Sequence, residues 1–344
     1  MSELIKKEFY ILIDCNRIQD YVFASYRLKE ICGASAQIAD LEKTKMPTLA
    51  NHYQGEIVRS GGGVVIAVFD DTEKRAFFEI EACKQYRDIG ISVTSETLDR
   101  ACGLADFNRD VLRPLFSKIV AKKVQPHSPE IAVSTILSVP CESSGDSAAE
   151  KAVFLPEGKI GRYSAAAAKK FSYAFRSRAD RNGPVPKTSL EEYCDYYGIP
   201  DDFDELVSWG KGVDASGHGS GTSEKRLMGI VYADVNGLGR ITENIGRKRD
   251  IYEYFAPELT RSLEKSLFEA ILCVINPHIV NGRKCKKLPF RLLYMGGDDL
   301  ALAVQGCFVL DLAAALVSKF EDNSRELMQP ESTIKTAGGR LKPG

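Results

Sequence analysis

The sequence Gly-Gly-Asp-Asp at residues 296–299 has the composition of a turn that binds metal or phosphate. Apolar segments at 290–295 and 300–304 flank it, and both are predicted to be strands. Because glycine tolerates a positive φ, the two glycines allow a tight hairpin turn. The carboxylates of Asp298 and Asp299 would then lie at the turn, where they could bind a divalent cation. The simpler alternative is an ordinary turn with solvated acids, since Gly and Asp are common turn residues.

A third aspartate follows another predicted strand. Asp234 comes directly after the apolar segment 227–233. If these strands are neighbours, as in a ferredoxin-like unit, Asp234 can meet Asp298 and Asp299. Three carboxylates without an adjoining His or Cys suit a hard cation, Mg²⁺ or Mn²⁺. Two such ions about 3.5–4 Å apart would activate a hydroxyl and stabilise a departing pyrophosphate.

Two further small-residue segments could approach a nucleotide. Residues 236–239 (Asn-Gly-Leu-Gly) lead toward a helix, and their glycines would let backbone N–H groups approach phosphate oxygens. A plain turn explains this segment equally well. Residues 33–35 (Gly-Ala-Ser) follow a predicted helix, where the Ser35 hydroxyl could contact a base or ribose. From spacing alone, this second segment is only a helix break near Gly33.

The two ends of the chain share one pattern. In the first half, a strand ending at residues 14–16 (Asp-Cys-Asn) precedes a helix and a hairpin with a glycine tip at 61–63. In the second half, a strand ending at 234–236 (Asp-Val-Asn) precedes a helix and the Gly-Gly-Asp-Asp hairpin. We interpret these as two copies of one β-α-β-β unit, of which only the second carries acids at its tip.

Hydrophobic periodicity predicts the remaining elements and an α+β fold. Small, polar segments at 141–150 and 211–225 predict loops, and a new strand follows the second of them. The expected domains are 1–140, a linking α/β region at 141–225, and 226–344. The predicted strands are 9–14, 89–95, 131–138 and 227–233, the hairpins 56–69 and 290–304, and the helices 17–43, 72–88, 106–123, 251–275 and 308–320.

Composition excludes several classes of protein. The 344 residues are 44% hydrophobic, enough for a sizeable core, and the net charge of −1 predicts no nucleic-acid or membrane partner by bulk charge. No apolar run approaches the 18 residues of a membrane span, and the first residues do not have the pattern of a signal peptide. Nine irregularly spaced cysteines without a C-x-x-C pair argue for a reducing cytoplasm and against a disulfide framework or a zinc site.

The segments YADVNGLGR (232–240) and YMGGDDLALAV (294–304) closely resemble the second palm domain of the large polymerase/cyclase subunit of type III CRISPR effector complexes (Csm/Cmr). The segment FYILIDCNRIQDYVFASYRLKEICGASAQIADL (9–41) resembles the first palm domain of that subunit. The resemblance implies two ferredoxin-like palms related to GGDEF and class III nucleotide cyclases. It also implies that two ATP molecules bind between the palms and are joined, with Mg²⁺ or Mn²⁺, into cyclic oligoadenylate messengers of antiviral defence.

The resemblance also assigns roles to residues and predicts partners. Target RNA and CRISPR RNA would act through other type III subunits, and a homodimer is a further assembly to test. The implied metal positions are Asp234, Val235, Asp298 and Asp299, and those along the nucleotides are Gly296, Gly297, Asn236, Gly237, Gly239, Gly33 and Ser35.

Three features depart from the family pattern. The chain begins directly at the first palm, without a His-Asp nuclease domain, and it stops soon after the helix that follows residue 308. Cys141 and its neighbours resemble the remnant of a zinc element that has lost its other cysteines. These features predict a minimal or truncated relative.

Three functions therefore stay open at the level of sequence. The leading hypothesis is a cyclic oligoadenylate synthase. The alternatives are a catalytically weak, nucleotide-binding or structural subunit of an RNA-guided complex, and a GGDEF-like cyclic dinucleotide synthase. The residues alone do not distinguish ATP from GTP.

Overall fold

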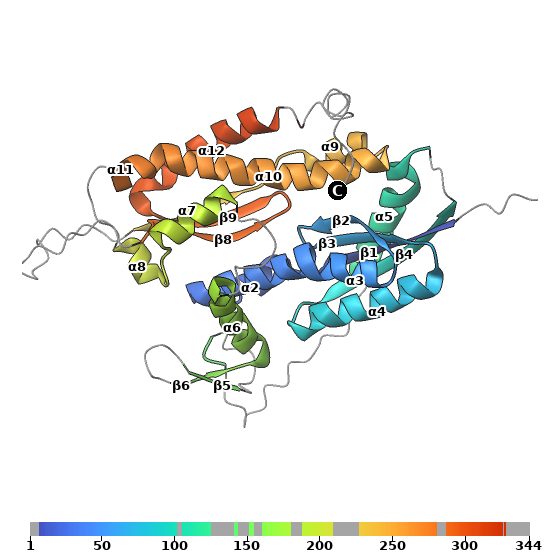
Figure 1. Cartoon of the computed structure of the whole chain (residues 1–344), viewed down its shortest axis with the longest axis horizontal. Coiled ribbons are helices and arrows are strands. Elements are labelled where there is room, and N and C mark those ends of the chain that lie inside the picture. Colours follow the sequence, from blue (N-terminus) through green and yellow to red (C-terminus); the bar gives the residue numbers. More distant parts are fainter. Residues whose placement is uncertain are drawn as a thin grey trace, which may run out of the picture. The chain divides into compact units, whose positions relative to one another are not determined.

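The computed structural model describes residues 7–101, 105–124, 141–143, 151–154, 160–179, 188–208, 227–280, 287–325 and 327. By its internal contacts the chain divides into two compact units (Figure 1). Unit 1 comprises Met1–Asp180 and Asn236–Pro257, and unit 2 comprises Arg181–Val235 and Glu258–Gly344. This division differs from the expected boundaries at 140 and 225, which stay predictions.

Unit 1 contains a four-stranded antiparallel sheet with the order β2-β3-β1-β4. Helices connect β1 to β2 and β3 to β4, so the unit has the β-α-β-β-α-β connectivity of a ferredoxin-like fold. The predicted hairpin 56–69 is confirmed. The strands are β1 (Lys7–Cys15), β2 (Glu56–Gly61), β3 (Val64–Phe69) and β4 (Val93–Ala101).

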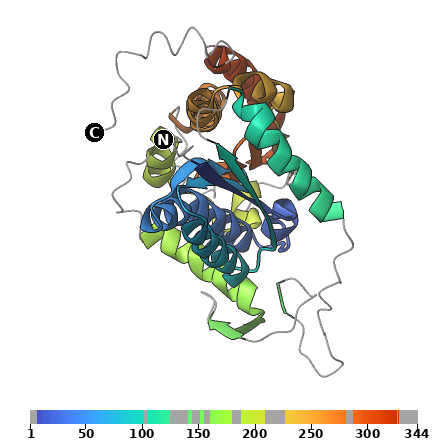
Figure 2. The ribbon, with the colours of Figure 1, turned by 90° about the vertical axis from the view of Figure 1, so that its right-hand side faces the viewer.

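Both faces of this sheet are covered. Tyr10 and Leu12 of β1 belong to a core that also includes Leu115 and Ile119 of α5 (Arg113–Val124). Side chains alternate along a strand, so Ile11 and Ile13 face the opposite side. Figure 2 shows α5 on one side of the sheet and, on the other, the blue helices α2 and α3 with the cyan helix α4. These helices are α2 (Leu28–Asp40), α3 (Met46–His52) and α4 (Thr72–Asp88), with the short α1 (Ile18–Val22) before them.

The expected helix break at Gly33 is wrong. The break lies between α1 and α2, and Gly33 is buried inside α2. A Cβ atom at Gly33 would come within 2.0 Å of the Lys170 carbonyl oxygen in α6 (Ala165–Ala179). Glycine therefore lets α2 and α6 pack closely, and this packing outweighs the weak helix propensity of glycine.

A π-helical turn, η1 (Leu41–Lys45), joins α2 to α3. The rest of unit 1 includes several elements that the sequence did not predict or placed differently, because their positions depend on tertiary packing. These are the hairpin β5 (Lys151–Phe154) and β6 (Ile160–Tyr163), the turn η2 (Asn108–Leu112), α6 and α9 (Leu238–Ile245). The predicted helix at 251–275 is confirmed as α10 (Arg249–Val274), whose first part also belongs to this unit.

Unit 2 contains a three-stranded antiparallel sheet with the order β7-β9-β8. This order repeats the β1-β3-β2 order of unit 1. Leu300, Leu302 and Val304 of the central strand are fully buried beside residues of α10 and α12. The elements are β7 (Met228–Ala233), β8 (Phe290–Gly296), β9 (Asp299–Gln305), α7 (Ser189–Tyr197), α8 (Phe203–Val207), α11 (Asn276–Val280), η3 (Gly306–Phe308) and α12 (Val309–Ser324).

The α+β class is confirmed, as are the helix at 72–88 and the hairpin at 290–304. The predicted strand at 89–95 begins later and runs further, as β4. The predicted strand at 131–138 and most of the two polar loops lie outside the described residues. Within the part of the chain that the structure describes, no helix has the length and apolar content to cross a bilayer.

The close contact at Gly33 makes a prediction about stability. Gly33→Ala should lower the free energy of unfolding by about 1–3 kcal/mol, because the new methyl group overlaps the backbone of α6. Gly239→Ala is the matched control, since nothing lies within 4 Å of a Cβ there. In chemical denaturation the control should be as stable as the wild type or up to about 1 kcal/mol more stable. Equal stability of Gly33→Ala and the wild type would contradict this packing.

Candidate active site at the edge of the unit 2 sheet

The Gly-Gly-Asp-Asp sequence forms the turn between β8 and β9. Gly296 pairs with Asp299 in the ladder, so Gly297 and Asp298 are the two residues of the turn. Gly297 has a φ of 64°, which favours glycine. The Thr260 hydroxyl of α10 donates a hydrogen bond to the Gly297 carbonyl over 3.3 Å. The turn is thus anchored to a helix that lies far away in the sequence.

Asp234 lies at the same edge as the turn. Ala233 is the last paired residue of β7, and its partner is Leu300. Asp234 therefore follows directly at the end where Asp299 begins β9. Side chains alternate, so the register places Tyr232, Asp234 and Asp299 on one face of the sheet. The tyrosine hydroxyl donates a hydrogen bond to Asp299 Oδ1 over 3.0 Å.

All three carboxylates act on the Tyr232 hydroxyl. Partial burial, the hydrogen bond to Asp299 and the negative charges of Asp299, Asp234 and Asp298 together raise the pKa of Tyr232 to about 12. A like charge disfavours an ionised phenol, so the three aspartates add to the larger effect of burial on this pKa. Sequence reasoning did not single out Tyr232 or Thr260, because neither belongs to a motif with a distinctive composition.

The donor set suits a hard divalent cation, since it offers carboxylate oxygens at a partly exposed edge. Val235 can contribute only its backbone carbonyl, because its apolar side chain is buried. Within the described residues, however, no group of three or more His, Cys, Asp or Glu side chains is already arranged to hold a metal ion. The structure brings the three aspartates to one edge but does not close them into a metal site.

The glycine-rich turn after Asp234 is open to solvent. Asn236, Gly237 and Gly239 are exposed. Gly237 has a φ of 74° and precedes the first residue of α9. Among the described residues, apart from the adjoining backbone, no atom lies within 4 Å of a Cβ position at Gly237 or Gly239, so this backbone is accessible to a ligand.

Gly33 and Ser35 lie on α2 of unit 1. Gly33 packs against α6, as described above, whereas Ser35 is partly exposed. Helix packing accounts for the glycine, and contact of either residue with a nucleotide stays a prediction.

In unit 1, the sheet edge that corresponds to the aspartate edge of unit 2 is filled by side chains of unit 1. Asp14 forms an ion pair with Lys123 over 2.9 Å. At the glycine tip, the buried Glu42 carboxylate accepts a hydrogen bond from the Gly63 N–H over 2.6 Å. Burial raises the pKa of Glu42 to about 7, although hydrogen bonds from the Gly63 and Gly62 backbone oppose the shift. No sequence signal identified Glu42, because its position depends on the turn η1.

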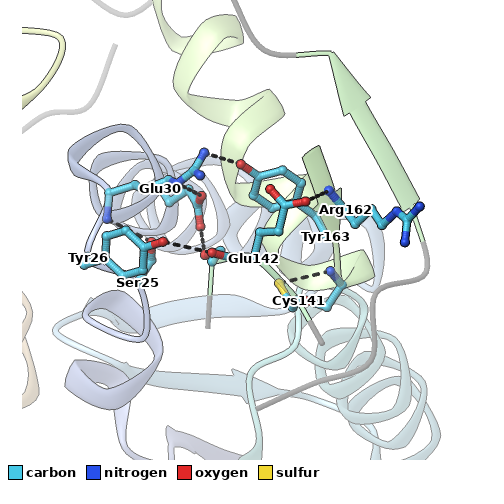
Figure 3. Close-up of polar contacts among 10 residues, drawn as sticks. Ser25, Tyr26, Glu30, Cys141, Glu142, Arg162 and Tyr163 are labelled. Atoms are coloured by element: carbon cyan, nitrogen blue, oxygen red, sulfur yellow. Dashed lines mark hydrogen bonds and ion pairs between the residues drawn. The ribbon is translucent and has the colours of Figure 1, made fainter. Parts of the chain in front are cut away.

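Hydrogen bonds hold Cys141 and its neighbours in place (Figure 3). The Cys141 sulfur accepts a hydrogen bond from the Ser164 N–H over 3.3 Å. Glu142 pairs with the backbone of Arg162, and its carbonyl accepts a hydrogen bond from the Tyr26 hydroxyl over 3.0 Å. The segment therefore has a structural role in unit 1, as an anchor to β6.

Similar folds occur in solved structures. No protein-family model and no curated protein matches this chain. A chain of the Csm1-Csm4 cassette in complex with one ATP has a TM-score of 0.59 and 13% sequence identity, covering 94% of this chain and 49% of that chain. The cassette in complex with cA4 gives a TM-score of 0.57 at 14% identity, covering 94% and 48%.

A third match is the Csm1-Csm4 subcomplex in the type III-A CRISPR-Csm interference complex. Its TM-score is 0.57 at 14% identity, and the match covers 95% of this chain and 50% of that chain. This chain thus spans about half the length of the chains it matches. At such low identity the similarity establishes a shared fold.

The buried Glu42 predicts a pH dependence of stability. Its pKa rises from 4.5 to about 7 on folding. Between these values the folded state keeps a proton that the unfolded state has released, so the free energy of unfolding falls as the pH rises through this range.

Glu42→Gln should remove most of this fall, roughly 1–3 kcal/mol between pH 5 and pH 8, since one pKa unit corresponds to about 1.4 kcal/mol. Urea denaturation at the two pH values measures the difference. Glu321→Gln, an exposed acid on α12, should behave as the wild type. An identical pH dependence in Glu42→Gln and the wild type would show that Glu42 is already ionised when folded.

Proposed function

We propose that this chain is a palm-type nucleotidyltransferase, a relative of the Csm1-like large subunits, which converts ATP into cyclic oligoadenylate in CRISPR type III antiviral defence. The single observation that supports it most is the strand register that brings Asp234, Asp298 and Asp299 to one sheet edge, where the Tyr232 hydroxyl bonds Asp299. The shared fold with Csm1-Csm4 structures that contain ATP or cA4 supports the choice of substrate and product.

In this proposal Asp234, Asp298 and Asp299, with the Val235 carbonyl, hold Mg²⁺ or Mn²⁺. The ion would lower the pKa of the attacking hydroxyl and neutralise charge on the leaving pyrophosphate. The carboxylates must move together to bind it, because they do not form a closed group within the described residues.

The glycines would serve the nucleotide. Gly296 and Gly297 have no side chains at the turn, so a triphosphate can approach the backbone there. Gly237 and Gly239 would offer backbone N–H groups near the start of α9, where the helix dipole favours an anion. Thr260 would position the turn through its hydrogen bond to Gly297.

The cellular setting belongs to the same proposal. ATP is the proposed substrate, and the cytoplasm is the proposed location. Other type III subunits would connect the chain to CRISPR RNA and target RNA, as the Csm1-Csm4 assemblies suggest. A homodimer is a further assembly that size measurement would detect.

A catalytically weak nucleotide-binding subunit is the second candidate. The aspartates are not already grouped for metal within the described residues, which favours this alternative. Unit 1 also favours a catalytically weak subunit, because Glu42 and the Asp14–Lys123 ion pair already fill the edge of its sheet that corresponds to the aspartate edge of unit 2.

Incubation with ATP or GTP and Mg²⁺ or Mn²⁺, followed by chromatography and mass spectrometry, tests the proposal. The wild type should release pyrophosphate and form a cyclic adenylate product. The double variant Asp298→Ala, Asp299→Ala should lose at least about 10³-fold in rate, because it removes several kcal/mol of charge stabilisation. Asp311→Ala, an exposed acid on α12, is the matched control and should keep full activity.

The outcomes separate the candidates. Product formation by the double variant would contradict the assigned site. Binding of ATP without release of pyrophosphate by the wild type would favour the second candidate. A cyclic dinucleotide made from GTP would identify a GGDEF-like synthase instead.

Tyr232→Phe tests the coupling between the tyrosine and the acids. Its hydroxyl occupies Asp299 Oδ1, so its removal should free that oxygen for the metal. We expect Mn²⁺ to bind about three- to tenfold more tightly, which corresponds to one hydrogen bond of about 1 kcal/mol. Calorimetric titration measures the change. Weaker Mn²⁺ binding in Tyr232→Phe would mean that the hydroxyl supports the metal site and does not compete with it.

A further inference from the structure

Unit 1 contains a cavity that the proposed reaction does not use. Its volume is about 810 Å³, which lies in the range of small-molecule sites. Residues of α2, η1, α3, α6 and the end of α4 line it. All of these elements belong to the same compact unit.

Two glutamines in its wall each have an amide atom without a partner. Gln37 is only 1% exposed; its Oε1 accepts a hydrogen bond from the Tyr21 hydroxyl, and its Nε2 has no partner within the described residues. Gln85 Oε1 is likewise buried and unpartnered there. Buried polar atoms are nearly always hydrogen-bonded, so an unpaired donor and an unpaired acceptor in one wall indicate a missing ligand.

The rest of the wall favours a neutral, planar ligand. Leu49 and Ile89 supply apolar surface, and Tyr173 adds an aromatic ring. The two lysines of the wall are already engaged: Lys45 lies 3.1 Å from the Asp40 carboxylate, and Lys169 donates a hydrogen bond to the Asp88 carbonyl. The cavity thus combines stacking surface with one unpartnered amide donor and one unpartnered amide acceptor, and its engaged lysines offer little attraction for a strong anion.

We propose that this cavity binds a nucleoside. The edge of its base would accept a hydrogen bond from Gln37 and donate one to Gln85. Each of the four nucleobases presents an acceptor beside a donor on its Watson–Crick edge. The base would pack against Leu49 and Ile89, and the ribose hydroxyls would face Thr48 and Ser172.

The position of the cavity connects it to the glycine tip. Thr44 and Lys45 of the π-helical turn η1 line the cavity, whereas Glu42 of the same turn holds the Gly63 N–H. π-helical turns occur frequently at functional sites. A bound nucleoside would therefore contact the turn that positions Glu42.

Calorimetric titration of the full chain with adenosine, guanosine, cytidine and uridine tests the proposal. At least one of the four should bind saturably. Gln85→Met should weaken that binding at least tenfold, because it keeps the length of the side chain but removes the acceptor. Gln19→Met, an exposed residue on α1 outside the cavity, is the matched control and should bind within twofold of the wild type.

Thermal unfolding separates a ligand role from a structural one. Without nucleoside, Gln85→Met should unfold at the same temperature as the wild type or higher, because it removes an unsatisfied buried oxygen. If this variant proves unfolded, Gln37→Met provides the same comparison at the other glutamine.

Two results would overturn the inference: no binding of any nucleoside, or undiminished binding by Gln85→Met. The double variant Asp298→Ala, Asp299→Ala should still bind the nucleoside. If that variant loses binding while Gln85→Met keeps it, the nucleoside occupies the aspartate edge, and the cavity proposal fails independently of the proposed reaction.

Discussion

The pairing of β7 with β9 is the constraint on which the candidate site depends. The register joins Ala233 to Leu300, so the chain leaves β7 as Asp234 at the end where Asp299 begins β9. The buried residues Leu300, Leu302 and Val304 fix that register, because a shift by one residue would replace them in the core with the small side chains of Ala301 and Ala303. Apolar packing in the sheet thereby sets the position of the charged side chains at its edge.

The same constraint has a different result in unit 1. Its strands have the equivalent order, and its hairpin also ends in glycines. There, Glu42 fills the space at the tip and Lys123 neutralises Asp14. The edge of unit 2 instead places three negatively charged side chains near Tyr232. The two sheets therefore share a strand order but differ at this edge. In unit 1 the polar groups of the edge are paired with other residues of the chain, whereas in unit 2 the edge carries carboxylates suited to a cation.

Sequence reasoning succeeded where the signal is local. The apolar runs beside residues 296–299 predicted the hairpin, and the strand ending at Asp234 predicted that the acids share an edge. It failed at Gly33, because a contact with α6 decides the role of that glycine. It could not find Glu42, whose burial depends on a π-helical turn and on residues distant in the sequence. Thr260 and the unpaired glutamines are likewise visible only after folding.

The central claim is that Asp234, Asp298 and Asp299 act as one metal centre. The most direct measurement is a Mn²⁺ titration followed by paramagnetic broadening of tyrosine ring signals, in the wild type and in single Asp→Asn variants at the three positions. The account predicts that Tyr232 broadens before the other tyrosines in the wild type and that each substitution suppresses this early broadening. Early broadening of Tyr232 that persists unchanged in Asp234→Asn would contradict a shared centre.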